Sequence, residues 1–228
     1  MTKLMVVGCS FSDQLENNQT NWGAELAGRL NYEHVHEARG CGSNYRMWRT
    51  VTTAILEGTL TSKDLLCVQY TNNDRMEFWS DTVHQGDPRL GSWEPWHQGG
   101  SLERFKDGAW TWNGQYPNLR KFFFQYETHF CNPTYNDHMF KVYHTMFQCL
   151  LKEHQIPTVF MYTRYKYFDA QFTLVDPFAA WAFREDPEEI KNTVNWFAPD
   201  DGSHLNDQGH KQFADQVYCH LDSLTFKF

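Results

Sequence analysis

The stretch from Asp64 to Tyr70, DLLCVQY, limits the possible folds of this chain more than any other segment. Its apolar character is almost continuous, and this pattern is typical of a strand that is buried on both faces of a parallel sheet. A parallel sheet needs helices that cover its faces and connect one strand to the next. The rest of the sequence should therefore supply short apolar strands that alternate with amphipathic helices.

The residues before this segment have that alternation. Lys3–Gly8 and Tyr32–Ala38 are predicted strands, and Trp22–Leu30 and Tyr45–Glu57 are predicted helices with apolar residues along one stripe. Strands and helices in this series predict a parallel sheet with right-handed crossover connections.

The same pattern returns in the C-terminal half of the chain. Asn136–His154 and Gln208–Leu221 are predicted helices, and Pro157–Thr163 is a predicted fourth strand. Two stretches lack a clean period, an insertion at about 75–135 and a smaller one at about 164–195. The prediction is a single α/β domain over residues 1–228, a flavodoxin-like three-layer αβα sandwich with a central parallel sheet.

The first insertion holds five of the nine tryptophans of the chain. A structureless loop of that length is unusual in a compact domain, so we expect the insertion to pack as a cap or subdomain. Short strands are predicted near Gly108–Gln115. Indole faces stack on sugar rings and on apolar acyl chains, so the tryptophans form either a substrate cap or a small core of their own.

Composition and charge exclude several classes of function. The chain has 20 Lys and Arg against 28 Asp and Glu, and the net charge of −8 argues against a nucleic-acid-binding surface. No run of apolar residues is long enough to span a membrane or to form the apolar region of a signal peptide. The six cysteines form no C-x-x-C pair, so we expect reduced thiols and a cytoplasmic location, or association with a virion if a phage encodes the protein.

Four polar motifs lie where predicted strands end or where the last helix begins. They are GCSFSD at 8–13, RGCGSN at 39–44, TNNDR at 71–75 and DDGSHL at 200–205. Open α/β sheets bind ligands at the carboxyl ends of their strands, so we expect the motifs to meet at one edge of the sheet.

The order and spacing of these motifs resemble those of the SGNH (GDSL-type) hydrolase family, over the whole core apart from the two insertions. The resemblance implies that Ser10 is the nucleophile and that Asn73 is the asparagine of the family name. Gly42 matches the glycine, with Gly40 as the rival alignment. The D-x-x-H block matches Asp201 and His204, and Asp200 is the alternative acid.

Two positions depart from the family pattern. Cys9 stands where the family has an aspartate, and Thr71 stands where it has a glycine, although neither position carries the reaction in the family scheme. The sequence is especially similar to a subgroup with G-C-S-F-[ST] near the N-terminus and S-N-x-R in the second motif, which occurs in phage and bacterial genomes.

Each of these residues has a chemical reason to be there. Ser10 is a weak nucleophile without a base, and His204 can take its proton and return it to the leaving group. Asp201 can hold the imidazole in the right tautomer. The N–H groups of Ser10 and Gly42 and the amide of Asn73 can form an oxyanion hole.

The resemblance therefore implies a serine esterase that acts through an acyl-enzyme, needs no metal or other cofactor, and has a small acylated molecule as its partner. The favoured substrate is a small carboxylic ester, above all an O-acetyl group on a carbohydrate. Asn44, Arg75 and Trp79 are expected to contact the substrate, with a local salt bridge as the alternative for Arg75. Two other functions stay open, acyl transfer by the same residues and a non-catalytic carbohydrate-binding or virion-structural protein on the same scaffold.

Each motif also has a purely structural interpretation. Residues 72–74 can form a solvated turn. Asp200 or Ser203 can cap the last helix, in which case the D-x-x-H spacing carries no chemistry. His34 and His36 lie on one face of a predicted strand, but no third ligand is nearby, so satisfied or solvated imidazoles are favoured over a metal site.

Overall fold

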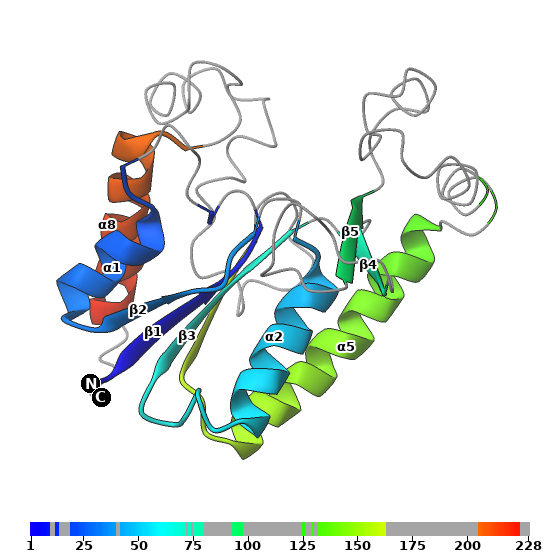
Figure 1. Ribbon diagram of the computed structural model, residues 1–228, viewed down its shortest axis with the longest axis horizontal. Coiled ribbons are helices and arrows are strands. Elements are labelled where there is room, and N and C mark those ends of the chain that lie inside the picture. Colours follow the sequence, from blue (N-terminus) through cyan, green and yellow to red (C-terminus); the bar gives the residue numbers. More distant parts are fainter. Residues whose placement is uncertain are drawn as a thin grey trace.

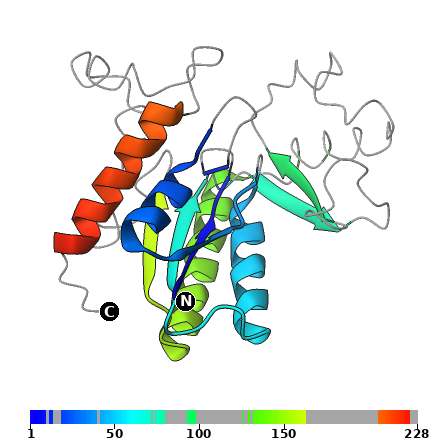
Figure 2. The ribbon, with the colours of Figure 1, turned by 60° about the vertical axis from the view of Figure 1, so that its left-hand side comes forward.

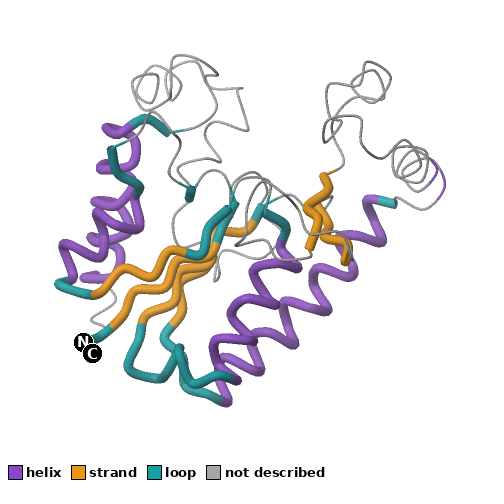
Figure 3. Tube along the Cα trace, viewed as in Figure 1, coloured by secondary structure: helices purple, strands orange, loops and turns teal. Residues whose placement is uncertain are grey.

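The structure is a computed structural model, and it describes residues 1–9, 12–13, 19–39, 42–71, 73, 75–79, 93–97, 125, 129, 132–162 and 205–223. Within these residues, four strands and four helices form the body of the domain and two further strands form a hairpin (Figures 1 and 3). In chain order the elements are β1 (Lys3–Val7), α1 (Trp22–Leu30), β2 (Glu33–His36), α2 (Asn44–Leu56), β3 (Leu65–Tyr70), β4 (Arg75–Trp79), β5 (Trp93–His97), α5 (Pro133–Glu153), β6 (Thr158–Tyr162) and α8 (Asp207–Ser223).

The four strands of the main sheet are all parallel and lie in the order β2-β1-β3-β6. Val6 of β1 pairs with His36 on one side and with Cys67 on the other. Helices α1 and α8 cover one face of the sheet, and α2 and α5 cover the other (Figures 1 and 2). This arrangement confirms the predicted three-layer αβα sandwich with a central parallel sheet.

Each of the four helices is preceded by a residue whose side chain caps the first turn. Asn21 caps α1, Ser43 caps α2 and Asn132 caps α5, each by accepting a hydrogen bond from a backbone N–H of that turn. In α8 the Asn206 side chain accepts from the N–H of Gly209 over 2.9 Å. The cap of α8 is therefore Asn206, and the expectation that Asp200 or Ser203 caps this helix is wrong.

The core on the α2 and α5 side contains a chain of hydrogen bonds between buried rings. The Trp48 indole N–H donates to the Tyr70 hydroxyl over 3.0 Å, and Tyr70 lies 2.8 Å from Nδ1 of His144. An indole can only donate, so the hydroxyl hydrogen of Tyr70 is directed to the imidazole, which accepts it in the neutral form. Burial lowers the pKa of His144 to about 4.

The hairpin formed by β4 and β5 lies in the first insertion, where the sequence pattern did not predict it. The two strands pair antiparallel, with Arg75 opposite His97 and Trp79 opposite Trp93. The sequence has no clean period over this insertion, and the strands predicted near Gly108–Gln115 lie outside the described residues. The signal that could have identified β4 is a short alternation, in which the apolar Met76 and Phe78 follow the charged Arg75 and Glu77.

The four cysteines that the structure describes are all free thiols. Cys9 and Cys67 are buried free thiols, and Cys149 and Cys219 are exposed free thiols. Burial raises the pKa of the Cys67 thiol well above its ordinary value. Across the helices that the structure describes, none combines the length and the apolar character needed to cross a membrane.

Candidate functional site

The strand order places a topological switch point between β1 and β3. The connection from β1 to β2 runs through α1 on one face, and the connection from β2 to β3 runs through α2 on the other face. Strands β1 and β3 are neighbours, so the first and third motifs leave the sheet side by side at their carboxyl ends. Open α/β sheets place ligands at this point.

Gly42 lies directly against the end of β1. A Cβ atom built on Gly42 would lie 2.9 Å from the carbonyl oxygen of Gly8, 3.0 Å from that of Arg39 and 3.7 Å from Cα of Cys9. Backbone atoms cannot move away as a flexible side chain would, so only glycine fits at this position. The structure thereby brings the second motif into contact with Cys9, the residue that precedes Ser10.

The N–H of Gly42 already has a partner. It donates to the carbonyl oxygen of Arg39 over 2.9 Å, and the N–H of Arg39 donates to the carbonyl oxygen of Gly8 over 3.2 Å. These bonds fold the chain after β2 into a turn across the end of β1. An oxyanion that used the Gly42 N–H would have to share this donor with the carbonyl oxygen of Arg39 or displace that oxygen.

Asn44 joins the second motif to the third. Its Oδ1 accepts from the N–H of Thr71 over 2.9 Å, and its Nδ2 donates to the carbonyl oxygen of Thr71 over 3.0 Å and to Oδ1 of Asn73 over 3.1 Å. The side chain is buried, and both ends of its amide are used within the protein. Asn44 therefore fixes the chain just beyond β3 relative to the first turn of α2.

Asn73 is held at both ends of its own amide. Its Oδ1 accepts from Asn44, and its Nδ2 donates to Oδ1 of Asp137 over 2.9 Å. A carboxylate accepts and does not donate, so the two partners together fix which end of the amide carries nitrogen. Asn73 is 9% exposed, so the alternative of a solvated turn is wrong for this residue.

Asp137 belongs to this site although none of the four sequence motifs contains it. It lies in the second turn of α5, one turn before the buried residues Phe140, His144 and Phe147 and on the same stripe of the helix. A carboxylate on the inward stripe of an amphipathic helix is the signal that could have identified it.

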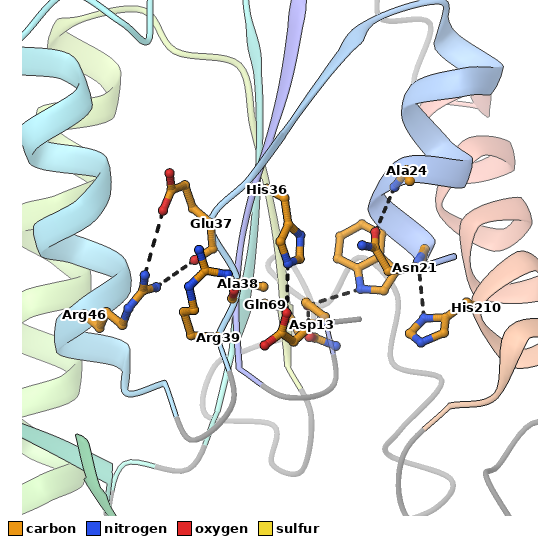
Figure 4. Close-up of polar contacts among 12 residues, drawn as sticks. Asp13, Asn21, Ala24, His36, Glu37, Ala38, Arg39, Arg46, Gln69 and His210 are labelled. Carbon is orange, nitrogen blue, oxygen red and sulfur yellow. Dashed lines mark hydrogen bonds and ion pairs between the residues drawn. The ribbon is translucent and has the colours of Figure 1, made fainter. Parts of the chain in front are cut away.

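The remaining residues of the S-N-x-R pattern, Ser43 and Arg46, form hydrogen bonds that stabilise the connection from β2 to α2. The Ser43 hydroxyl oxygen accepts from the N–H of Arg46 over 3.1 Å. The Arg46 guanidinium donates to the carbonyl oxygen of Glu37 over 2.7 Å and lies 3.8 Å from its carboxylate (Figure 4). The pattern therefore builds the support for Gly42 and Asn44.

Ser12, the second serine of the first motif, is fully buried. Its hydroxyl is hydrogen-bonded to the Gln69 side chain and accepts from the indole N–H of Trp22 over 3.1 Å. The N–H groups of Ser12 and Asp13 both donate to the carbonyl oxygen of Cys9. The described part of the loop after β1 is therefore a tight turn anchored to β3 and to α1.

The start of α8 is anchored to the start of α1. Oδ1 of Asp207 accepts from the N–H groups of Gln19 and Thr20, and Nδ1 of His210 accepts from the N–H of Trp22 over 3.2 Å (Figure 4 shows His210 facing α1). The Trp22 ring also packs edge-on against Phe213, with a centroid distance of 5.1 Å. Trp22 thus contacts both the loop of the first motif and the helix that follows the D-x-x-H block.

Several predicted site residues lie outside the described residues. They are Ser10, Asp201 and His204, together with the rivals Gly40 and Asp200. Leu205, which follows His204, is described and is buried. Of Arg75 and Trp79 the structure describes the backbone, which begins β4 two residues after Asn73 and places it in contact with α2.

His34 and His36 lie on β2 next to the first motif. Nε2 of His36 lies 3.0 Å from a carboxylate oxygen of Asp13 (Figure 4), and the two imidazole centroids are 5.5 Å apart. Burial, and to a smaller extent the positive charge of His36, lowers the pKa of His34 to about 4. Within the described part of the chain, no group of three or more His, Cys, Asp or Glu side chains is placed to hold a metal ion.

Comparison with known proteins finds similarity in fold. No protein-family model matches the chain, and no curated protein does. Protein YXIM_BACsu from Bacillus subtilis is similar in structure, with 11% identity and a TM-score of 0.53 over 99% of this chain and 57% of that chain. This chain therefore spans little more than half the length of that relative. A protein from Desulfitobacterium hafniense DCB-2 that is assigned to the lipolytic G-D-S-L family aligns with 10% identity and a TM-score of 0.49, over 96% of this chain and 99% of that chain.

Proposed function

We propose that this protein is a serine esterase of the SGNH type that forms an acyl-enzyme on Ser10. The observation that carries the proposal is the meeting of three motifs at the β1–β3 switch point. Cys9 contacts Gly42, Asn44 is hydrogen-bonded to Asn73, and both pairs lie at the carboxyl edge of the sheet. The second motif therefore contacts both the residue before Ser10 and the third motif. These contacts agree with the motif order of the family.

Ser12 is poorly suited to be the nucleophile, which favours Ser10 within the same motif. The Ser12 hydroxyl is fully buried and bonded to Gln69 and Trp22, so an ester carbonyl has no access to it. In the proposal, the hydrogen bonds of Ser12 hold the loop that presents Ser10. Trp22 bonds both to Ser12 and to His210, which supports a fixed spacing between Ser10 and His204.

The proposed reaction has two half-reactions. Oγ of Ser10 attacks the ester carbonyl carbon while His204 takes the hydroxyl proton, and Asp201 holds the imidazole in place. The tetrahedral oxyanion accepts from the N–H of Ser10 and from Nδ2 of Asn73. His204 then protonates the departing alkoxide, and a water molecule activated by the same imidazole releases the acid from Ser10.

For the substrate we propose a short acyl group on a hydroxyl-rich molecule, with an O-acetylated carbohydrate as the first choice. The support comes from the chain that leaves the third motif. Strand β4 starts two residues after Asn73, and its last residue, Trp79, pairs with Trp93 of β5, so the hairpin that follows the third motif carries indole rings. Indole rings stack on sugar faces, and Arg75 can bind an anionic or hydroxyl group.

One observation favours the non-catalytic alternative, a carbohydrate-binding protein on the same scaffold. The Gly42 N–H, one of the three expected oxyanion donors, is occupied by the carbonyl oxygen of Arg39. A binding protein needs no such donor, whereas an esterase has to work with the other two or with a shared hydrogen bond.

The test is the hydrolysis of p-nitrophenyl acetate and the release of acetate from O-acetylated sugars by the full chain. The Ser10→Ala variant should lose essentially all activity, because the acyl group then has no acceptor. Ser62→Ala, which changes an exposed serine between α2 and β3, is the matched control and should retain wild-type rates. Activity that survives in Ser10→Ala overturns the proposal, and binding of acetylated sugars without any turnover supports the alternative.

A further inference from the structure

We propose that Asp137 is a positioning residue of the esterase site, which orients the Asn73 amide for the oxyanion. The inference rests on the proposed function and adds to it a residue from α5, an element that carries none of the four motifs. Its basis is the hydrogen bond of 2.9 Å from Nδ2 of Asn73 to Oδ1 of Asp137.

The geometry assigns Asp137 a definite task. An amide side chain at the end of a strand can rotate and can exchange the positions of its oxygen and nitrogen. Asn44 binds the oxygen of Asn73, and Asp137 binds one of the two hydrogens of its nitrogen. With both ends held, the second hydrogen on Nδ2 has a fixed direction before the substrate binds, as an oxyanion hole requires.

The carboxylate acts through its oxygen rather than through its charge. A negative charge near a developing oxyanion opposes the reaction, because like charges repel. An asparagine at position 137 would keep an oxygen that accepts from Asn73 and would remove the charge. The conservative variant therefore separates the two effects, since positioning predicts that it restores the rate.

The placement of Asp137 makes this role compatible with a folded variant. The residue is partly exposed and lies in the second turn of α5, where its loss leaves the cap at Asn132 and the hydrogen bond between Tyr70 and His144 in place. A thermal melt of each variant, followed by circular dichroism, checks this directly. Glu153→Ala, which removes an exposed carboxylate from the other end of α5, is the matched control.

The kinetic test compares Asp137→Ala, Asp137→Asn, Asn73→Ala and the Asn73→Ala/Asp137→Ala double variant on p-nitrophenyl acetate. Loss of one oxyanion donor costs roughly 10²–10³ in kcat, and loss of its orientation should cost less, about tenfold, with KM nearly unchanged. Asp137→Asn should recover most of that loss. In the Asn73→Ala background, Asp137→Ala should add almost nothing, because the group that it positions is gone.

Side-chain amide NMR gives a second test that does not depend on turnover. The NH₂ resonances of Asn73 are identified by their absence from the spectrum of Asn73→Ala. They should shift and exchange faster in Asp137→Ala but stay close to their wild-type positions in Asp137→Asn and Glu153→Ala.

An unchanged Asn73 signal in Asp137→Ala overturns the inference, as does a kcat loss of the same size in both backgrounds or no rescue by Asp137→Asn. Failure of the proposed function is recognised separately, by full activity of Ser10→Ala. An inactive Ser10→Ala combined with wild-type kcat in Asp137→Ala refutes the positioning role alone.

Discussion

The Asn44 side chain donates to the Asn73 side-chain oxygen over 3.1 Å and also clamps both backbone groups of Thr71. One buried amide thereby fixes the third motif of the chain to the second. The nitrogen of Asn44 binds both Thr71 and Asn73, and its oxygen binds the N–H of Thr71.

Replacing Asn44 with alanine should lower both stability and activity. The buried N–H and C=O of Thr71 lose their partners, so the free energy of unfolding should fall by about 2 kcal/mol. The turnover of p-nitrophenyl acetate should fall as well, because Asn73 loses one of its two anchors. Urea unfolding and steady-state kinetics measure the two effects, with Thr53→Ala on the exposed face of α2 as control. A variant as stable and active as the wild type contradicts the clamp.

A methyl group at position 42 should be poorly tolerated. In Gly42→Ala the new Cβ meets two backbone carbonyl oxygens at 2.9 and 3.0 Å, so the turn must shift, at a cost of roughly 1–3 kcal/mol in unfolding free energy. Because the turn lies beside Cys9, esterase activity should fall too. Gly28→Ala is the matched control, since nothing lies within 4 Å of its new Cβ on α1.

The control should behave in the opposite way. Gly28 lies in the last turn of α1, and alanine within a helix is favoured over glycine, so Gly28→Ala should raise the unfolding free energy by up to about 1 kcal/mol and leave activity unchanged. Equal stabilities of the two variants would show that Gly42 is not confined by the end of β1.

Two buried tryptophans allow a test of the link between Ser12 and α8. Trp22→Phe keeps a ring against Phe213 but removes the indole N–H that donates to Ser12. Trp48→Phe removes a similar N–H, which donates to Tyr70 on the other face of the sheet. Each change should cost about 1 kcal/mol or somewhat more of unfolding free energy.

The two variants should differ in catalysis. Trp22→Phe loosens the loop that presents Ser10, so its kcat should fall severalfold more than that of Trp48→Phe, whose hydrogen bond to Tyr70 does not involve the loop of the first motif. Stability and kcat are measured on the same preparations. Equal kcat values for the two variants would mean that the bond between Trp22 and Ser12 has no part in the site.

The buried His144 predicts a loss of stability in mild acid. Its pKa is about 4 in the folded protein and near 6.5 in an unfolded chain, so the unfolded state binds its proton first as the pH falls. The neutral His144 therefore contributes fully to the free energy of unfolding above about pH 6.5. This contribution falls progressively as the pH drops to about 4, by roughly 3 kcal/mol at most.

The measurement is the free energy of unfolding between pH 7 and pH 4.5. His144→Gln should reduce the pH dependence in this range and leave the part that the buried His34 causes, whereas His154→Gln, at an exposed position just after α5, should leave it as in the wild type. An unchanged slope in His144→Gln would contradict the neutral, buried imidazole and its hydrogen bond to Tyr70.

The sequence predicted the body of the fold well because its elements are amphipathic or continuously apolar. Helix α1 has the predicted bounds, Trp22 to Leu30, and β3 follows the apolar run that ends at Tyr70. Helix α5 begins three residues before its predicted start, because Asn132 and Pro133 form a cap and first turn that apolar periodicity does not register. The β4–β5 hairpin was missed because a short two-stranded ribbon with a proline in one strand has a weak pattern.

The sequence predicted only those site residues that belong to the four motifs. Gly42, Asn44 and Asn73 do meet at the edge of the sheet, as the motif order implies. Asp137 binds Asn73, which lies 64 residues earlier, and Trp22 binds His210, which lies 188 residues later, so no local pattern marks these partners. The occupied N–H of Gly42 likewise depends on the shape of one turn, which residue types alone do not determine.

The most direct test of the central claim is the site of covalent labelling by a fluorophosphonate. The full chain is treated with the probe, digested and sequenced by tandem mass spectrometry, which distinguishes Ser10 from Ser12 within one peptide. A single adduct on Ser10 is expected in the wild type and in Ser62→Ala, and none in Ser10→Ala. Labelling at Ser12 or elsewhere, or no labelling of the folded wild-type protein, would contradict the central claim.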